Sequence, residues 1–240
     1  MLTLALPRWC IKLIGMIGWR NIWKGVSPVV VAAMAVVPTA AQAHPHLFID
    51  TGIEVVVDAQ NRATGVRITW SYDDLFSLSV IADKQMDTDW DGRLTAEELT
   101  RLSGFDMNWD AGYPGDTYAL VGDVDLPLSR AKDFSARYED GKITTVHLRT
   151  FDAPVPIGDV PLIIQVYDPG FYTAYTVMPN PLVTGGSGCV AVAYGPDIDA
   201  ADEALKAALA EYSADADLEA DFPAIGKNYA EEVRVTCAAP

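Results

Sequence analysis

Twelve residues from Asp87 to Glu98, with the sequence DTDWDGRLTAEE, constrain the fold of this chain more than any other stretch. Aspartates stand at the first, third and fifth positions, glycine stands at the sixth, and glutamate stands at the twelfth. This is the spacing of an EF-hand calcium loop, which wraps about six to eight oxygens around one hard cation. The alternative is an acidic turn that binds nothing. The predicted calcium ligands are Asp87, Asp89, Asp91, the backbone carbonyl of Arg93, Thr95 and Glu98.

Helical patterns flank this loop on both sides. Asp73 is typical of an N-cap, and apolar residues at helical spacing predict an incoming helix from Asp74 to Met86. Thr95 and Glu98 form a capping box for an outgoing helix that ends at Gly104. The helix–loop–helix insertion therefore spans about residues 74–104. No second loop of this type pairs with it in the sequence, which favours a structural ion over a calcium sensor.

The remainder of the chain reads as short strands separated by turn residues. Alternating apolar residues predict a first hairpin over 53–58 and 64–72, and similar strands recur to the end of the chain. An alanine-rich segment over 197–213 predicts a C-terminal helix. The expected fold is mainly β, an antiparallel sandwich or small barrel, and α+β overall.

The first 43 residues have the pattern of a signal peptide. They carry four basic and no acidic residues, an apolar run over 26–37, and the sequence Ala-Gln-Ala at 41–43. Cleavage after Ala43 would release residues 44–240 into the periplasm as a single domain, without membrane insertion. A retained membrane anchor is the alternative, but the apolar run falls short of the roughly 20 residues that a span needs.

Cleavage would make an acidic chain more acidic. The full chain has 17 basic and 33 acidic residues, so the loss of four basic residues leaves 13 and a formal charge of about −20. Such a surface repels nucleic acid and anionic membranes and attracts cations. We therefore expect no nucleic-acid partner.

Two cysteines, Cys189 and Cys237, remain in the predicted mature chain. In an exported protein they most simply form one disulfide that ties the C-terminus to the domain. A metal-binding thiol pair is the alternative, but the two residues lack the close spacing of such a pair.

Three histidines could bind a transition metal. His44 and His46 lie at the predicted new N-terminus, where His44 would offer its α-amine and its ring nitrogen as a chelate. His147, on a predicted strand, could complete a site for nickel, cobalt, zinc or copper that is similar to a copper histidine brace. The alternative is that the first two are solvated and that His147 is a satisfied strand residue.

Several motifs together resemble a known family. They are HPHLFID after the signal peptide, a strand ending at Trp70, the calcium-type loop, the strand pair EDGKITTVHLR, and Tyr-Asp-Pro at 167–169. The chain resembles an uncharacterised family of bacterial periplasmic proteins, a domain-of-unknown-function family often labelled the periplasmic component of an ABC-type transport system. The resemblance implies a role in metal traffic with a membrane metal transporter as partner.

Three functions are compatible with these patterns. The first is a periplasmic metal-binding accessory protein for transition-metal uptake or export, with a structural calcium site. The second is a calcium-stabilised module that binds a protein or a small ligand. The third is a copper redox protein, but the sequence has no nucleophile elbow, no His-Glu-x-x-His and no phosphate-binding loop. We therefore expect that the chain is not an enzyme.

Overall fold

Two long strands begin the part of the chain that the structure, a computed structural model, describes: residues 45–213, 215–218 and 221–238. Strands β1 (Leu47–Val57) and β2 (Arg62–Tyr72) pair antiparallel, with Ile53 opposite Ile68. Buried residues alternate along both strands, as expected when one face of a sheet packs on a core. The Asp58 carboxylate shapes the turn between them by accepting hydrogen bonds from the backbone N–H groups of Gln60 and Arg62.

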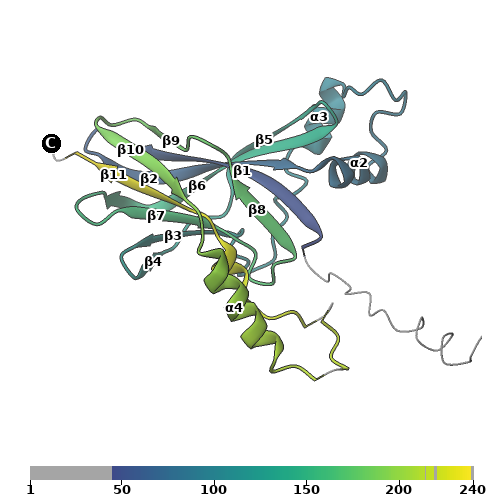
Figure 1. The fold of residues 1–240 in the computed structure, drawn as a ribbon. Coiled ribbons are helices and arrows are strands. Elements are labelled where there is room, and N and C mark those ends of the chain that lie inside the picture. The colour runs from purple at the N-terminus through teal and green to yellow at the C-terminus, as the bar shows by residue number, and fades with distance from the viewer. Residues whose placement is uncertain (1–44, 214, 219–220, 239–240) are drawn as a thin grey trace, which may run out of the picture. The chain divides into compact units, whose positions relative to one another are not determined.

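These strands lie in the middle of the larger sheet, whose strand order is β5-β6-β2-β1-β8, with β9 also paired to β1 (Figure 1). Its other members are β5 (Lys132–Glu139), β6 (Lys142–Pro156), β8 (Thr173–Val177) and β9 (Leu182–Thr184). Strands β8 and β9 run parallel to β1, because the chain returns along the open edge of β1 in the same direction. The sequence predicted only antiparallel pairing and did not predict β9.

The second sheet has the strand order β10-β11-β7-β3-β4, and all its pairs are antiparallel. Its strands are β3 (Thr117–Val121), β4 (Val124–Leu126), β7 (Leu162–Val166), β10 (Cys189–Tyr194) and β11 (Glu232–Cys237). Buried residues of both sheets, such as Val55, Ile68, Ile164 and Val233, belong to one apolar cluster. The sheets therefore share a single core, and neither closes into a barrel. The predicted β-rich, α+β class is confirmed.

Three α-helices accompany the sheets in the described part of the chain. They are α2 (Asp74–Asp83), α3 (Ala96–Leu102) and α4 (Ile198–Leu209), and a 3₁₀ turn covers Gly226–Tyr229. Helices α2 and α3 follow β2 and precede β3 in chain order, and the loop Asp87–Glu98 begins between them (Figure 1). All three are shorter than the sequence pattern predicted. No helix among the described residues is long and apolar enough to cross a membrane.

A disulfide joins Cys189 to Cys237, as predicted. The two residues lie directly opposite each other where β10 begins and β11 ends. The bond closes a loop with a sequence separation of 48 residues, which contains α4 and the acidic segment after it. It therefore attaches the end of the chain to an edge strand of the second sheet.

Removing this bond should destabilise the domain. We expect the double variant Cys189→Ser/Cys237→Ser to lose about 3–4 kcal/mol of unfolding free energy, because the cross-link limits the freedom of the unfolded chain. Urea denaturation of both proteins, with and without reductant, measures the effect. Reductant should destabilise the wild type and leave the double variant unchanged. An equal midpoint for the oxidised wild type and the variant would contradict the prediction.

Candidate functional site

Short-range hydrogen bonds cap the first turn of each helix in the helix–loop–helix. The Asp73 carboxylate accepts the backbone N–H of Phe76 at 2.9 Å and caps α2, as the sequence predicted. Thr95 caps α3: its hydroxyl accepts the N–H of Glu98, and the Glu98 carboxylate accepts the N–H of Thr95 at 2.8 Å. The acidic loop therefore leads directly into a helix start with defined geometry.

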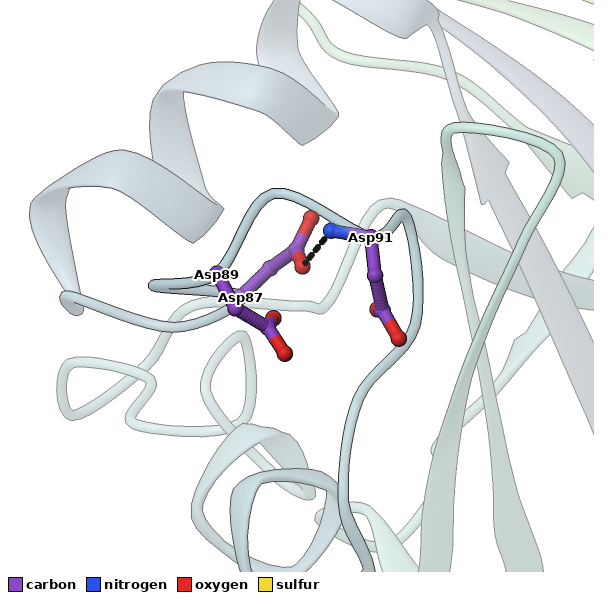
Figure 2. A group of neighbouring side chains, drawn as sticks. All are labelled: Asp87, Asp89 and Asp91. Atoms are coloured by element: carbon purple, nitrogen blue, oxygen red, sulfur yellow. Dashed lines mark hydrogen bonds between the residues drawn. The ribbon is translucent and has the colours of Figure 1, made fainter.

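Three carboxylates converge inside this loop. Each of Asp87, Asp89 and Asp91 offers an oxygen, and these oxygens lie within 4.8 Å of one another. Asp87 is 5% exposed, and its carboxylate accepts the N–H groups of Asp91 and Gly92 (Figure 2). Gly92 turns the chain with a φ of +76°, a conformation that glycine adopts without steric cost. A group of oxygens with this density of negative charge fits a hard divalent cation such as Ca²⁺.

The other predicted calcium ligands surround this group. The Glu98 carboxylate accepts the N–H of Asp87 at 3.1 Å, so the last loop position is tied to the first. Hydrogen bonds from Thr95 lower the pKa of Glu98, which keeps this carboxylate charged. Glu98 is not among the acids that converge within 4.8 Å in the described chain, because its oxygens engage Thr95 and Asp87 instead. Arg93 and Thr95 are exposed. Three of the six predicted ligands are thus brought together.

His46 and His147, the two histidines that the structure describes, lie apart from each other. His44 lies outside the described residues, whereas His46 is exposed just before β1, with its ring 4.8 Å from that of Tyr172. His147 is opposite Ile68 on β2, and Ile68 is opposite Ile53 on β1. Ile53 is seven residues along the chain from His46, which corresponds to about 20 Å of extended strand. The fold therefore gives no support to a site that uses both His46 and His147.

His147 is a core residue of the larger sheet. It is 0% exposed, and its ring packs edge-on against Trp70 and Trp109, at centroid distances of 4.7 and 5.7 Å. Burial, assisted by the positive charge of Arg149, lowers the pKa of His147 to about 3, so the ring stays neutral. Neither ring nitrogen has a hydrogen-bond partner among the residues described.

A cavity of about 450 Å³ lies beside these rings, and the sequence did not predict it. Its wall comes from β1, β2, α2, β8 and the loop over residues 103–116 that follows α3. Seven aromatic side chains line it: Trp70, Tyr72, Phe76, Phe105, Trp109, Tyr113 and Tyr175. Two aromatic segments of the sequence, 70–72 and 171–175, could line the interface of a ligand-binding module, and Trp70, Tyr72 and Tyr175 from these segments do line the cavity. The contribution of the segment between Phe105 and Asp116 has no clear pattern in the sequence.

Two carboxylates border this cavity. Asp106 accepts hydrogen bonds from the hydroxyls of Tyr72 and Thr145, both at 2.7 Å. Asp116 accepts one from the Tyr175 hydroxyl at 2.8 Å. In each carboxylate the second oxygen, Oδ1, is buried and lacks a partner at hydrogen-bond geometry among the described residues.

Burial changes the acidity of both groups. Desolvation raises the pKa of Asp106 above its ordinary value, although the bonds from Thr145 and Tyr72 oppose this. Desolvation also raises the pKa of Asp116 to about 6, against the opposing effect of the nearby Tyr113 and Tyr175 hydroxyls. The charged form of each carboxylate is therefore costly while water is excluded and no cation is near.

Together these features define the class of protein. It is a two-sheet β protein with an inserted helix–loop–helix that gathers three carboxylates. It also has an aromatic cavity that two further carboxylates border. The chain belongs to the family described as Protein of unknown function (DUF1007), whose model matches residues 29–237. That description assigns no enzymatic activity to the family. No curated protein matches the chain.

The raised pKa of Asp116 predicts a pH-dependent effect of Asp116→Asn. The folded-state pKa of about 6 exceeds the ordinary value of 3.8, so the folded state loses stability as pH rises from about 4 through about 6. Asparagine keeps the shape and tolerates the φ of 46° at this position. At pH 7 we expect Asp116→Asn to be more stable than the wild type by roughly 1–3 kcal/mol.

Denaturant unfolding at pH 7 and below pH 4 measures this difference, which should vanish at the lower pH. Asp140→Asn is the control, because Asp140 is an exposed aspartate at a φ of 52° in the turn between β5 and β6. A pH-independent effect of Asp116→Asn would contradict the predicted titration.

Proposed function

We propose that this chain is an exported metal-binding accessory protein, in which calcium bound by the loop Asp87–Glu98 stabilises the domain. The observation that carries the proposal is the convergence of oxygens from Asp87, Asp89 and Asp91 within 4.8 Å. The loop joins α2 to α3, and the buried side chains of Ile81 and Leu102 on these helices belong to the main core. A bound calcium ion would neutralise the repulsion between the loop carboxylates and would therefore stabilise the packing of both helices on the core.

We further propose that the new N-terminus supplies the exchangeable metal site. This part depends on His44 and His46, and on the resemblance to a periplasmic component of a transport system. His46 borders a surface hollow whose lining also includes Asp73, Asp74 and Lys142, and a metal there would compete with the Lys142–Asp74 ion pair at 3.7 Å. Such nitrogen and oxygen donors suit nickel, cobalt, zinc or copper. The partner would be a membrane metal transporter.

Calcium binding is tested by Asp87→Asn, which removes one charge at the most buried loop ligand. For a lone loop outside the cytosol we expect a wild-type Kd of about 10⁻⁴–10⁻³ M. At 100 times Kd, calcium should stabilise the wild type by about 2.7 kcal/mol. The variant should bind calcium at least tenfold more weakly in calorimetry and should show little calcium-dependent rise in Tm.

Asp140→Asn is again the matched control, because it changes the same residue type at a positive φ outside the loop (47° for Asp87 and 52° for Asp140). It should respond to calcium as the wild type does. If Asp87→Asn also keeps the full calcium response, the loop is an acidic turn and the proposal fails.

The transition-metal site is tested with protein exported and cleaved by the cell, in excess calcium so that the loop is saturated. We expect His44→Ala/His46→Ala to lose most of the affinity for nickel, cobalt, zinc or copper in calorimetry. His147→Leu should retain that affinity, because His147 is buried in the core and far from His46. Unchanged metal binding by the double variant would remove the terminal histidines from the function.

A further inference from the structure

The aromatic cavity is lined by none of the residues proposed as metal ligands. Its volume of about 450 Å³ falls within the range of roughly 300–1,000 Å³ that is usual for small-molecule sites. It reaches the surface near Asp83 and Lys84, two exposed residues at the end of α2. A small molecule could therefore enter it from solvent.

The rings that line the cavity form two groups in contact. In the first, Tyr72 stacks on Phe76 at a centroid distance of 5.0 Å and also meets Phe105 at 5.6 Å. In the second, Trp70 lies 6.0 Å from Tyr175 and 6.5 Å from Trp109. Aromatic faces carry partial negative charge, so a wall of this kind attracts a cation without binding it through a lone pair.

Full negative charge is added by Asp106 and Asp116. Asp116 is 4% exposed, and its Oδ1 is buried beside the cavity with no hydrogen bond to any residue the structure describes. The buried Arg149 lies over the Trp109 ring at 5.3 Å and donates its hydrogen bonds to backbone carbonyls, and its charge offsets that of Asp116 only in part. Lys84, which also lines the cavity, is exposed and lies over the Phe105 ring at 5.8 Å. Neither cation forms an ion pair with Asp106 or Asp116 in the described chain.

We propose that this cavity binds a small organic cation, an amine or quaternary ammonium group, held between the aromatic rings and the carboxylates of Asp106 and Asp116. A bound cation would offset the desolvation that now makes the charged carboxylates costly. An anion would be repelled by the two carboxylates, and a neutral apolar ligand would leave their negative charge uncompensated.

A metal ion fits this cavity less well than an organic cation. Calcium and transition metals need several ligand atoms at one point. Among the described residues, the acids and histidines that converge in this way are those of the loop Asp87–Asp91, and neither Asp106 nor Asp116 belongs to such a group. The rings offer a large cation–π surface but few ligand atoms for a metal.

The test compares two probes of the same shape. Choline carries a quaternary ammonium group, and 3,3-dimethylbutan-1-ol is its neutral isostere. We expect calorimetry with the mature, calcium-saturated protein to show choline or tetramethylammonium binding at least tenfold more tightly than the neutral alcohol. Quenching or a shift of tryptophan fluorescence should accompany binding, because Trp70 and Trp109 line the cavity.

Asp106→Asn and Asp116→Asn should each weaken choline binding at least fivefold, whereas Asp140→Asn should not change it. Near-UV circular dichroism checks that each variant is folded. If one carboxylate variant does not fold, the other alone suffices for the comparison. The proposal is overturned if no organic cation binds, if the alcohol binds as tightly as choline, or if both asparagine variants bind like the wild type. It is also overturned if zinc or calcium binds to Asp87→Asn protein in a manner that requires Asp106 and Asp116.

Discussion

One buried cation holds together the segment on which the cavity depends. The Arg149 guanidinium, on β6, donates hydrogen bonds to the backbone carbonyls of Pro114 and Thr117 and to those of Leu128 and Ser129. Burial lowers its pKa to about 10, so it remains charged at neutral pH. One side chain on the larger sheet thus bonds both to the segment that leads into β3 and to the segment that follows β4. Without these bonds several buried carbonyls would lack partners, and the loop before β3 would be held by fewer bonds, among them those to Tyr72, Thr145, Tyr175 and neighbouring backbone.

That loop connects the proposed calcium site to the proposed organic-cation site. The chain leaves α3 and passes Phe105, Asp106, Trp109 and Tyr113 along the cavity before it reaches Asp116. Helix α2, on the other side of the acidic loop, supplies Phe76, Val80, Asp83 and Lys84 to the same wall. Any ion that stabilises the packing of α2 and α3 on the core would therefore also stabilise the cavity. This arrangement gives a physical reason for the proposed calcium site in an otherwise β-rich domain.

The parts of the fold that local interactions specify were predictable. The capping residues Asp73 and Thr95, the glycine at position 92 and the alternation along β1 and β2 each act within a few residues, so their effects can be seen in sequence order. The partner of Cys189 was predictable because only one other cysteine remained after the proposed cleavage. Strand β9 and the parallel pairing of β8 with β1 were not, because a short edge strand leaves almost no periodic signal.

The sequence by itself determined the acidic loop, its helix caps, the β-rich class and the disulfide, since each depends on residue type at a fixed spacing. Only the tertiary structure decided the environment of His147, which the register of β1, β2 and β6 buries far from His46. It also decided that Asp106 and Asp116 line one cavity with aromatic rings from three other segments of the chain, β2, α2 and β8. Burial and long-range register have no local pattern, because they arise from how distant segments pack around one core.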